Sequence, residues 1–171
     1  MSPVNLKLFI KLLKEYAGIR NVKTEVILLG GVALHYYGMI HRATLDVNAE
    51  IKGEINPLKN FLKSKGVPAD LGEDISRWSL ISLPAGYRRR AVTIYKDKKT
   101  TLKVLSPLDL VIAKLRRFTE QDITDALFVA NKFKISAAQI EKAKNSALKS
   151  SPQDTALSIF EKNVVYFIQQ I

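Results

Sequence analysis

One stretch, Ile27–Ile51, constrains the fold of this chain more than any other. An apolar run ends in Gly30-Gly31, and a second run with apolar residues at every other position, Thr44–Ile51, follows after a short segment. Glycine takes backbone conformations that other residues avoid, and it lets another backbone or a ligand come close. We therefore predict a strand, a tight turn that opens a brief helix, and a second strand.

The second of these strands carries Asp46, Asn48 and Glu50 at alternate positions. Alternate residues of a strand point to the same face, so the three polar side chains would line one side. Mg²⁺ takes oxygen ligands, usually one or two carboxylates together with substrate phosphates and water. The row therefore predicts a metal site, and the alternative is a solvated strand face. The diglycine would present backbone N–H groups to an anion, or form only a tight turn.

Composition limits the classes of protein to which the chain can belong. Its 171 residues, of which 47% are apolar, suit one domain or a core with a small extension. No cysteine is present, which excludes disulfides and thiolate zinc sites. No apolar run reaches the ~20 residues of a membrane helix, and Lys7 and Lys11 interrupt the N-terminal segment, so we expect a cytoplasmic protein without a signal peptide.

The charge of the chain favours a polyanionic partner. There are 27 basic and 16 acidic side chains, which gives a net charge of +11. Such a balance is typical of proteins that bind RNA, another polyanion or a nucleotide, although an inert lysine-rich surface would give the same count. The basic cluster Arg88-Arg89-Arg90 is the predicted nucleic-acid contact, with a solvated loop as the alternative.

The periodicity changes at Ser106. Before it, short apolar and alternating runs predict strands and helices in mixture. After it, helical periodicity continues to the end, and Ser106-Pro107-Leu108-Asp109 is typical of a helix N-terminus. We predict an α/β (α+β) fold with a small mixed sheet in residues 1–105 and a C-terminal helical bundle in residues 106–171. The predicted helices are 5–17, 32–37, 57–65, 107–117, 120–133, 136–149 and 153–170, the predicted strands are 24–29, 44–51, 78–83, 91–95 and 101–105, and 66–74 is a predicted loop.

Several short motifs occur in an order that is typical of one superfamily. The first group is Gly30-Gly31-x-Ala33 followed by Arg42-x-Thr44-x-Asp46-x-Asn48. The later group is Ser106-Pro107-x-Asp109-Leu110, Lys114-Leu115, Arg117, Asp122 and Asp125, with Leu83–Tyr87 and Arg90 between the two groups. Together they resemble the nucleotidyltransferase-fold superfamily that includes DNA polymerase β. The resemblance is closer to small prokaryotic nucleotidyltransferase-like proteins, including abortive-infection toxins of toxin–antitoxin pairs, and it covers about residues 26–128.

The resemblance implies a transferase that moves a nucleotidyl group from an NTP to RNA or a protein, with Mg²⁺ or Mn²⁺ as the metal. It implies that Gly30 and Gly31 hold the nucleotide phosphates, with Arg42 and Thr44 in the same nucleotide site. It further implies an antitoxin-like partner protein. The implied metal ligands are Asp46, Asn48 and Glu50, the implied triphosphate contact is Lys114, and the implied catalytic residues are Asp46, Lys114 and Asp122.

A second function remains open because Asn48 stands where the family has its second metal-binding aspartate. A chain with that replacement could bind nucleotide, RNA or a partner protein without turning the nucleotide over, so its status as an enzyme stays open at this point. The later candidates have ordinary alternatives too. Lys114 could be a solvated lysine, and Asp122 and Asp125 could pair with Arg116, Arg117 or Lys132. A purely structural module is the third alternative.

Overall fold

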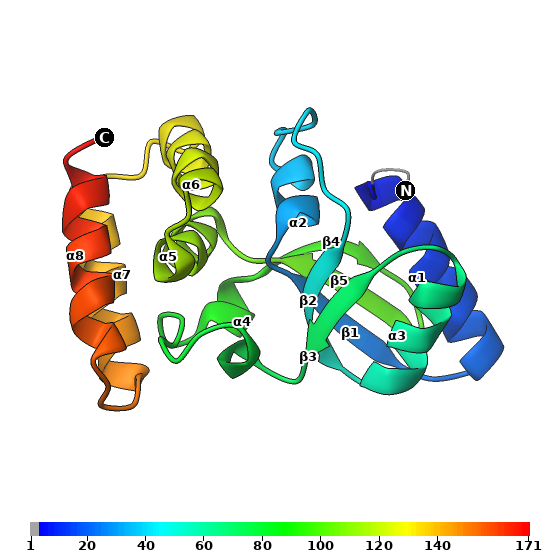
Figure 1. The fold of residues 1–171 in the computed structure, drawn as a ribbon. Coiled ribbons are helices and arrows are strands. Elements are labelled where there is room, and N and C mark those ends of the chain that lie inside the picture. Colours follow the sequence, from blue (N-terminus) through cyan, green and yellow to red (C-terminus); the bar gives the residue numbers. More distant parts are fainter. Residues whose placement is uncertain (1–3) are drawn as a thin grey trace. The chain divides into compact units, whose positions relative to one another are not determined.

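The computed structural model describes residues 4–171 and confirms the predicted mixed α/β fold, with helices around a mixed sheet (Figure 1). The elements in chain order are α1 (Leu6–Arg20), β1 (Thr24–Leu28), α2 (Gly31–Tyr36), β2 (Val47–Lys52), α3 (Ile55–Ser64), β3 (Ala69–Gly72), a 3-10 turn (Ile75–Arg77), α4 (Tyr87–Arg90), β4 (Val92–Lys96), β5 (Thr100–Val104), α5 (Pro107–Arg117), α6 (Glu120–Lys132), α7 (Ala137–Ser150) and α8 (Ala156–Ile168).

The chain divides into two compact units. The first combines the residues up to Asp74 with Ala91–Val104, and it contains α1 to α3 and the sheet. The second combines Ile75–Arg90 with Leu105–Ile171, and it contains α4 to α8. The predicted domains, 1–105 and 106–171, differ from this division only in where residues 75–90 and 105 belong, and their independence as domains stays a prediction.

The sheet of the first unit has the strand order β3-β2-β1-β5-β4. Its central strand, β1, runs antiparallel to β2 and parallel to β5. At the edges, β3 is parallel to β2, and β4 and β5 form the predicted antiparallel hairpin. Since β2 begins at Val47 and not at the predicted Thr44, Asp46 lies immediately before the strand and Asn48 and Glu50 lie within it.

Two helices cover one face of this sheet. α1 packs on β5, α3 packs on β3, and the two helices contact each other, so they share a face. Asn5 caps α1, because its side chain accepts a hydrogen bond from the backbone N–H of Leu8. The core between these helices and the sheet is built from apolar side chains at helical and alternating spacing. Its buried members include Phe9, Leu13, Tyr16, Val26, Leu28, Leu58, Leu62, Leu102 and Val104.

Two sequence predictions between residues 66 and 83 were wrong. Ala69–Gly72, predicted as loop, is the edge strand β3. A short edge strand needs only one partner and tolerates nearby proline and glycine, so it carries little alternation to detect. Residues 78–83, predicted as a strand, form no strand. Their polar groups bond to the end of α7 instead, because Ser82 donates from its N–H to Ser151 Oγ and from its Oγ to the carbonyl of Ser150.

The helices of the second unit begin at capping residues that the sequence carries. Ser106 caps α5 by accepting from the backbone N–H of Asp109, with Pro107 at the first helical position, as predicted. Thr119 with Asp122 and Ser136 with Gln139 form capping boxes at α6 and α7. The caps fix the helix starts, while packing between α5, α6, α7 and α8 buries the apolar stripes. The buried residues include Leu110, Val111, Leu115, Val129, Ile140, Phe160, Val164 and Phe167.

Candidate functional site

The Gly30-Gly31 turn is a place of close approach within the first unit. A Cβ atom on Gly30 would lie 2.5 Å from Oδ1 of Asn48. A Cβ atom on Gly31 would overlap Oγ1 of Thr44 and lie 2.6 Å from Nη1 of Arg42. Both glycines are therefore required by the side chains that pack on them, which come from β2 and from the segment leading into it.

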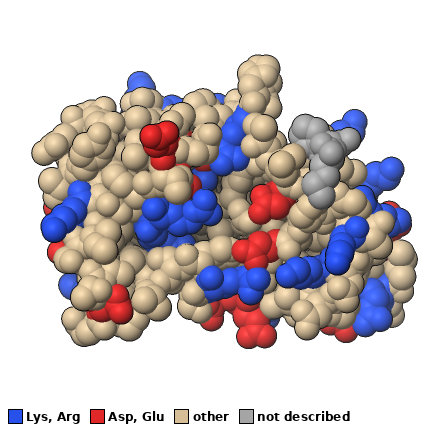
Figure 2. Space-filling view, in the orientation of Figure 1, with Lys and Arg blue, Asp and Glu red and all other residues tan. Residues whose placement is uncertain are grey.

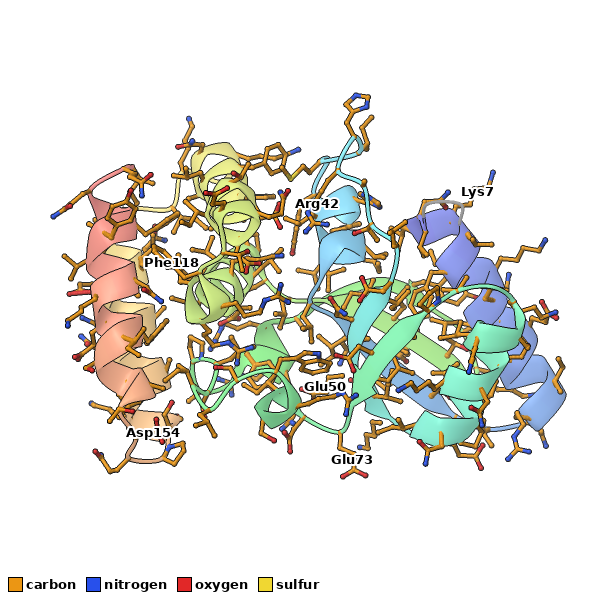
Figure 3. All side chains as sticks on the ribbon, viewed as in Figure 1. Lys7, Arg42, Glu50, Glu73, Phe118 and Asp154 are labelled. Carbon is orange, nitrogen blue, oxygen red and sulfur yellow. The ribbon has the colours of Figure 1, made fainter. Side chains whose placement is uncertain are left out.

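Arg42 and Thr44 are held in that segment by hydrogen bonds. Nη1 of Arg42 donates to Oγ1 of Thr44 at 2.9 Å and to the carbonyl of Ala43 at 3.2 Å. Nε2 of His35, on α2, donates to the carbonyl of Arg42 at 2.7 Å. Figure 3 shows Arg42 beside α2. A guanidinium is thereby fixed next to the diglycine turn, where it could meet an anion.

Asp46 and Asn48 form a pair at the same turn. Nδ2 of Asn48 donates to Oδ2 of Asp46 at 2.9 Å, and Asp46 is exposed. Asn48 therefore turns its amide nitrogen to the carboxylate, while its oxygen faces Gly30. As arranged, the pair offers one carboxylate for an external ligand and not two oxygen ligands for the same ion.

Glu50 lies on the same strand but is enclosed. It is 6% exposed, on β2 opposite Ile27 of β1, and Figure 3 labels it there. Its side chain shares a face with Asn48, as the alternation predicted. The three predicted ligands are therefore neighbours along one face, but only Asp46 is exposed.

The oxygen atoms of these three residues fit a divalent cation in only one binding mode. Within residues 4–171 no group of three His, Cys, Asp or Glu side chains is placed to hold a metal ion. Mg²⁺ is nevertheless often bound by one or two carboxylates with the remaining ligands from phosphates and water. Asp46 fits that mode as a single carboxylate ligand beside a nucleotide, and a site made by the protein alone does not fit.

Replacing Gly31 with alanine is expected to destabilise the first unit by about 1–3 kcal/mol, the range for overpacking in a filled site. The added methyl group would displace Thr44 and Arg42 from the turn. Urea unfolding of the variant measures the loss. Gly18 offers a matched control, because nothing lies within 4 Å of a Cβ atom there and its backbone is helical. Gly18→Ala should leave stability unchanged or raise it, and an equal loss at both positions would contradict the packing argument.

The remaining predicted catalytic residues form a cluster in the second unit. Nζ of Lys114 lies 2.8 Å from Oδ2 of Asp125 and 3.3 Å from Oδ1 of Asp122. Asp122 also accepts from Thr119 in the capping box and pairs with Arg117 at 3.3 Å. Lys114, Asp122 and Asp125 are 6%, 1% and 0% exposed. Lys114 and Arg117 together thus balance the two aspartates, and the Arg117–Asp122 pair agrees with the alternative of ion pairing.

The three consecutive arginines have different surroundings. Arg90 pairs with Asp109 through Nη2 and Nε, at 2.8 and 3.0 Å, and also donates to the carbonyls of Ala85 and Pro84. The carboxylate raises the pKa of the Arg90 guanidinium, partly opposed by burial. Arg88 lies over the ring of Tyr87, and Arg89 is exposed. Arg90 is therefore committed to a structural pair, which leaves Arg88 and Arg89 as the outward members of the predicted contact.

Arg116 is a half-buried cation, which the sequence suggested only as a partner of Asp122 or Asp125. Its Nη1 donates to the carbonyl of Ile81 at 2.7 Å, while its Nε is buried without a hydrogen-bond partner. Burial lowers the pKa of Arg116 to about 10, so the side chain stays charged at neutral pH. It follows Leu115 in an ordinary helical pattern, so no sequence signal distinguishes it from a surface arginine.

The structure therefore brings together two separate sets of predicted site residues. Gly30, Gly31, Arg42, Thr44, Asp46 and Asn48 meet in the first unit, with Glu50 further along β2. Lys114, Asp122 and Asp125 meet in the second unit. Figure 2 shows that lysine and arginine side chains are spread over both units. The first set supplies an exposed carboxylate and a guanidinium at one turn, and it is the stronger candidate for a ligand site.

Comparison with known proteins gives one match. A family model described as "Nucleotidyltransferase of unknown function (DUF6036)" matches residues 5–159. No curated protein and no solved structure matches significantly. Within residues 4–171 no helix is long and apolar enough to span a membrane.

Proposed function

The chain belongs to this family of nucleotidyltransferases of unknown function, and we propose that it transfers a nucleotidyl group from an NTP to RNA or a protein at the Gly30-Gly31 turn. The observation that carries the proposal is the presence of a guanidinium and an exposed carboxylate at the same turn. Arg42 lies against Gly31, and the exposed carboxylate of Asp46 lies beside Asn48, which packs on Gly30. A cation for phosphate oxygens and a carboxylate for a metal are the two parts that such a site needs.

In the proposed reaction, a hydroxyl oxygen of the acceptor attacks the α-phosphorus of the NTP. A new bond forms between that oxygen and the α-phosphorus, and the bond from this phosphorus to the α,β-bridging oxygen breaks. The hydroxyl proton passes to solvent, and pyrophosphate leaves with the bridging oxygen. Arg42 would bind phosphate oxygens and orient the triphosphate. Asp46 would hold Mg²⁺ or Mn²⁺ against the phosphates, and the ion would neutralise their charge. Most of the catalysis would be positioning and charge neutralisation.

The test is incubation of the purified protein with each α-labelled NTP, Mg²⁺ or Mn²⁺, and an RNA pool, followed by analysis of both RNA and protein for label. Asp46→Ala is expected to reduce incorporation about 100-fold or more, the scale for loss of one preorganised charge-stabilising group. Glu73→Ala is the matched control, because Glu73 is an exposed carboxylate of the same unit beyond the end of β3 (Figure 3). No label from any NTP, or equal label in both variants, would contradict transfer at Asp46.

The second candidate is a protein of this family that binds nucleotide, RNA or a partner protein without transfer. The hydrogen bond from Asn48 to Asp46 favours it, because an amide nitrogen faces the place where a second carboxylate would bind the ion. Asn48→Asp distinguishes the two candidates. If the variant gains metal-dependent NTP binding or transfer that the parent lacks, the parent is a binding protein. An antitoxin-like partner, expected from the resemblance to abortive-infection toxins, is compatible with either candidate.

A further inference from the structure

A polar cavity lies in the first unit, at the end of the sheet away from the Gly30-Gly31 turn. It has a volume of about 330 Å³ and opens where β1 and β5 begin and where β2 and β4 end. The strand register places four of its side chains in one row across the sheet, in the order Lys52, Glu25, Thr101 and Lys96. The complete lining is Lys23, Thr24, Glu25, Lys52, Lys96, Asp97, Lys98, Lys99 and Thr101.

The positive charge of this cavity is not balanced by its own acids. Glu25 pairs with Lys103, at 2.5 Å. Asp97 accepts from the hydroxyl of Tyr95 and from the backbone N–H groups of Lys99 and Thr100, and these hydrogen bonds hold its pKa below the ordinary value. No ion pair joins the five lining lysines to any carboxylate within residues 4–171. The cavity therefore gathers five ammonium groups around two acids that are already engaged.

Thr24 also lines the cavity, but its side chain belongs to the other face of the sheet, because Thr24 and Thr100 alternate with Glu25 and Thr101 along β1 and β5. Thr24 and Thr100 are 4% and 1% exposed, so their hydroxyls lie with the buried face. The charged side chains of the cavity, and not these hydroxyls, are therefore its candidate ligand contacts.

We propose that this cavity, here called the lysine cavity, binds the phosphodiester backbone of a nucleic acid. Lysine is a common phosphate ligand as a flexible point charge, and backbone binding depends on several such charges together. The cavity also lies on the face of β2 that carries the candidate site, because Asn48, Glu50 and Lys52 alternate along that strand. Lys52 and Asp46 are six residues apart, which spans about 20 Å in extended chain, so a short length of nucleic acid bound in the lysine cavity could reach Asp46.

The choice of a nucleic acid over an acidic peptide rests on the proposed function, in which RNA is one acceptor. Binding in the lysine cavity does not depend on transfer, so the two proposals can fail separately. If no transfer is found but RNA binding depends on the cavity lysines, the proposed transferase function is wrong and the proposal of RNA binding in the lysine cavity stands. If NTP incorporation is found but RNA does not bind, the transferase proposal stands with a protein as the acceptor. The proposal that the lysine cavity binds nucleic acid is then wrong.

The test measures binding of a labelled oligouridine to the full chain between about 50 and 200 mM salt. The variant Lys52→Gln/Lys96→Gln/Lys99→Gln is expected to bind about tenfold more weakly or worse, with a salt slope smaller by about 2, because each lost phosphate contact contributes about 0.7 for a single strand. The control Lys59→Gln/Lys63→Gln/Lys142→Gln removes the same charge from exposed helix positions outside the lysine cavity. Equal losses in both triple variants would show an effect of net charge alone and would overturn the proposal.

Two further arms identify the ligand chemistry. Oligothymidine tests DNA as the source of the phosphodiester, and a poly-glutamate chain of similar charge tests a polyanion without phosphate. Binding of either nucleic acid that is weakened selectively by the cavity variant supports the proposal and names the source. Binding of poly-glutamate with equal affinity and equal sensitivity to the variant would overturn it.

Discussion

Replacing Lys114 with methionine is expected to lower the free energy of unfolding by about 3–5 kcal/mol, the cost of leaving buried charges without their partner. Its ammonium lies 2.8 Å from Asp125 and 3.3 Å from Asp122, and each of these aspartates is almost fully enclosed. Asp122 keeps Arg117 and the Thr119 cap, and Asp125 keeps the hydrogen bond from Gln121. The variant therefore removes the ammonium that lies between the two enclosed carboxylates.

Urea unfolding followed by circular dichroism measures this effect. Lys132→Met is the matched control, since Lys132 is an exposed lysine on the neighbouring helix α6, and a change within about 0.5 kcal/mol is expected there. The double variant Lys114→Met/Asp125→Leu should recover part of the stability, because it removes one buried positive and one buried negative charge together. A loss below 1 kcal/mol in Lys114→Met would contradict the structural role and favour the predicted triphosphate contact.

Replacing Arg90 with methionine is expected to cost about 3 kcal/mol of unfolding free energy, at the lower end for a broken buried pair because the arginine itself is 41% exposed. The variant would leave the carboxylate of Asp109, which is 1% exposed, with the hydrogen bond from the Ser106 hydroxyl but without its cation. It would also leave the carbonyls of Ala85 and Pro84 without the guanidinium that joins them to α5.

Thermal and urea unfolding check the Arg90 prediction, with the adjacent Arg89→Met as the control. Arg89 is exposed, so its replacement should change stability by no more than about 0.5 kcal/mol. RNA binding provides a second comparison. If Arg89 contacts a phosphate, Arg89→Met should weaken RNA binding while the stability of the protein stays unchanged. Equal stability of the two variants would show that the Arg90–Asp109 pair contributes little, although it is bidentate.

The sequence predicted those parts of the fold that depend on local chemistry. Ser106, Pro107 and Asp109 specify the start of α5, because a cap, a fixed φ and a first-turn acid act within four residues. The diglycine turn followed by a strand was predicted for a similar reason, since only a residue without a side chain fits at Gly31. The β4–β5 hairpin followed from two apolar runs around a charged turn.

Features that depend on distant partners could not be predicted in this way. Ala69–Gly72 becomes a strand only because β2 is available beside it. Asp109 has the same sequence signal whether or not Arg90 reaches it, and the sequence does not say which atom of Asn48 faces Asp46. The sequence likewise carries no sign that the lysines of the lysine cavity lie together, because they come from three separate segments that only the sheet brings together.

The path of the chain between the two units has a consequence for how the protein can be dissected. The chain passes from the first unit to the second at Asp74, returns at Ala91, and leaves again after Val104. A fragment that stops at residue 105 would contain every strand of the sheet, but its Arg90 would have no Asp109. On the ribosome, β5, which pairs with the central strand β1, is made only after residues 75–90, whose partners follow later. Each unit is made of two separate segments, so no single cut in the chain separates one complete unit from the other. Residues 75–90 therefore emerge before the rest of their unit and remain without it until residues 105–171 have been synthesised.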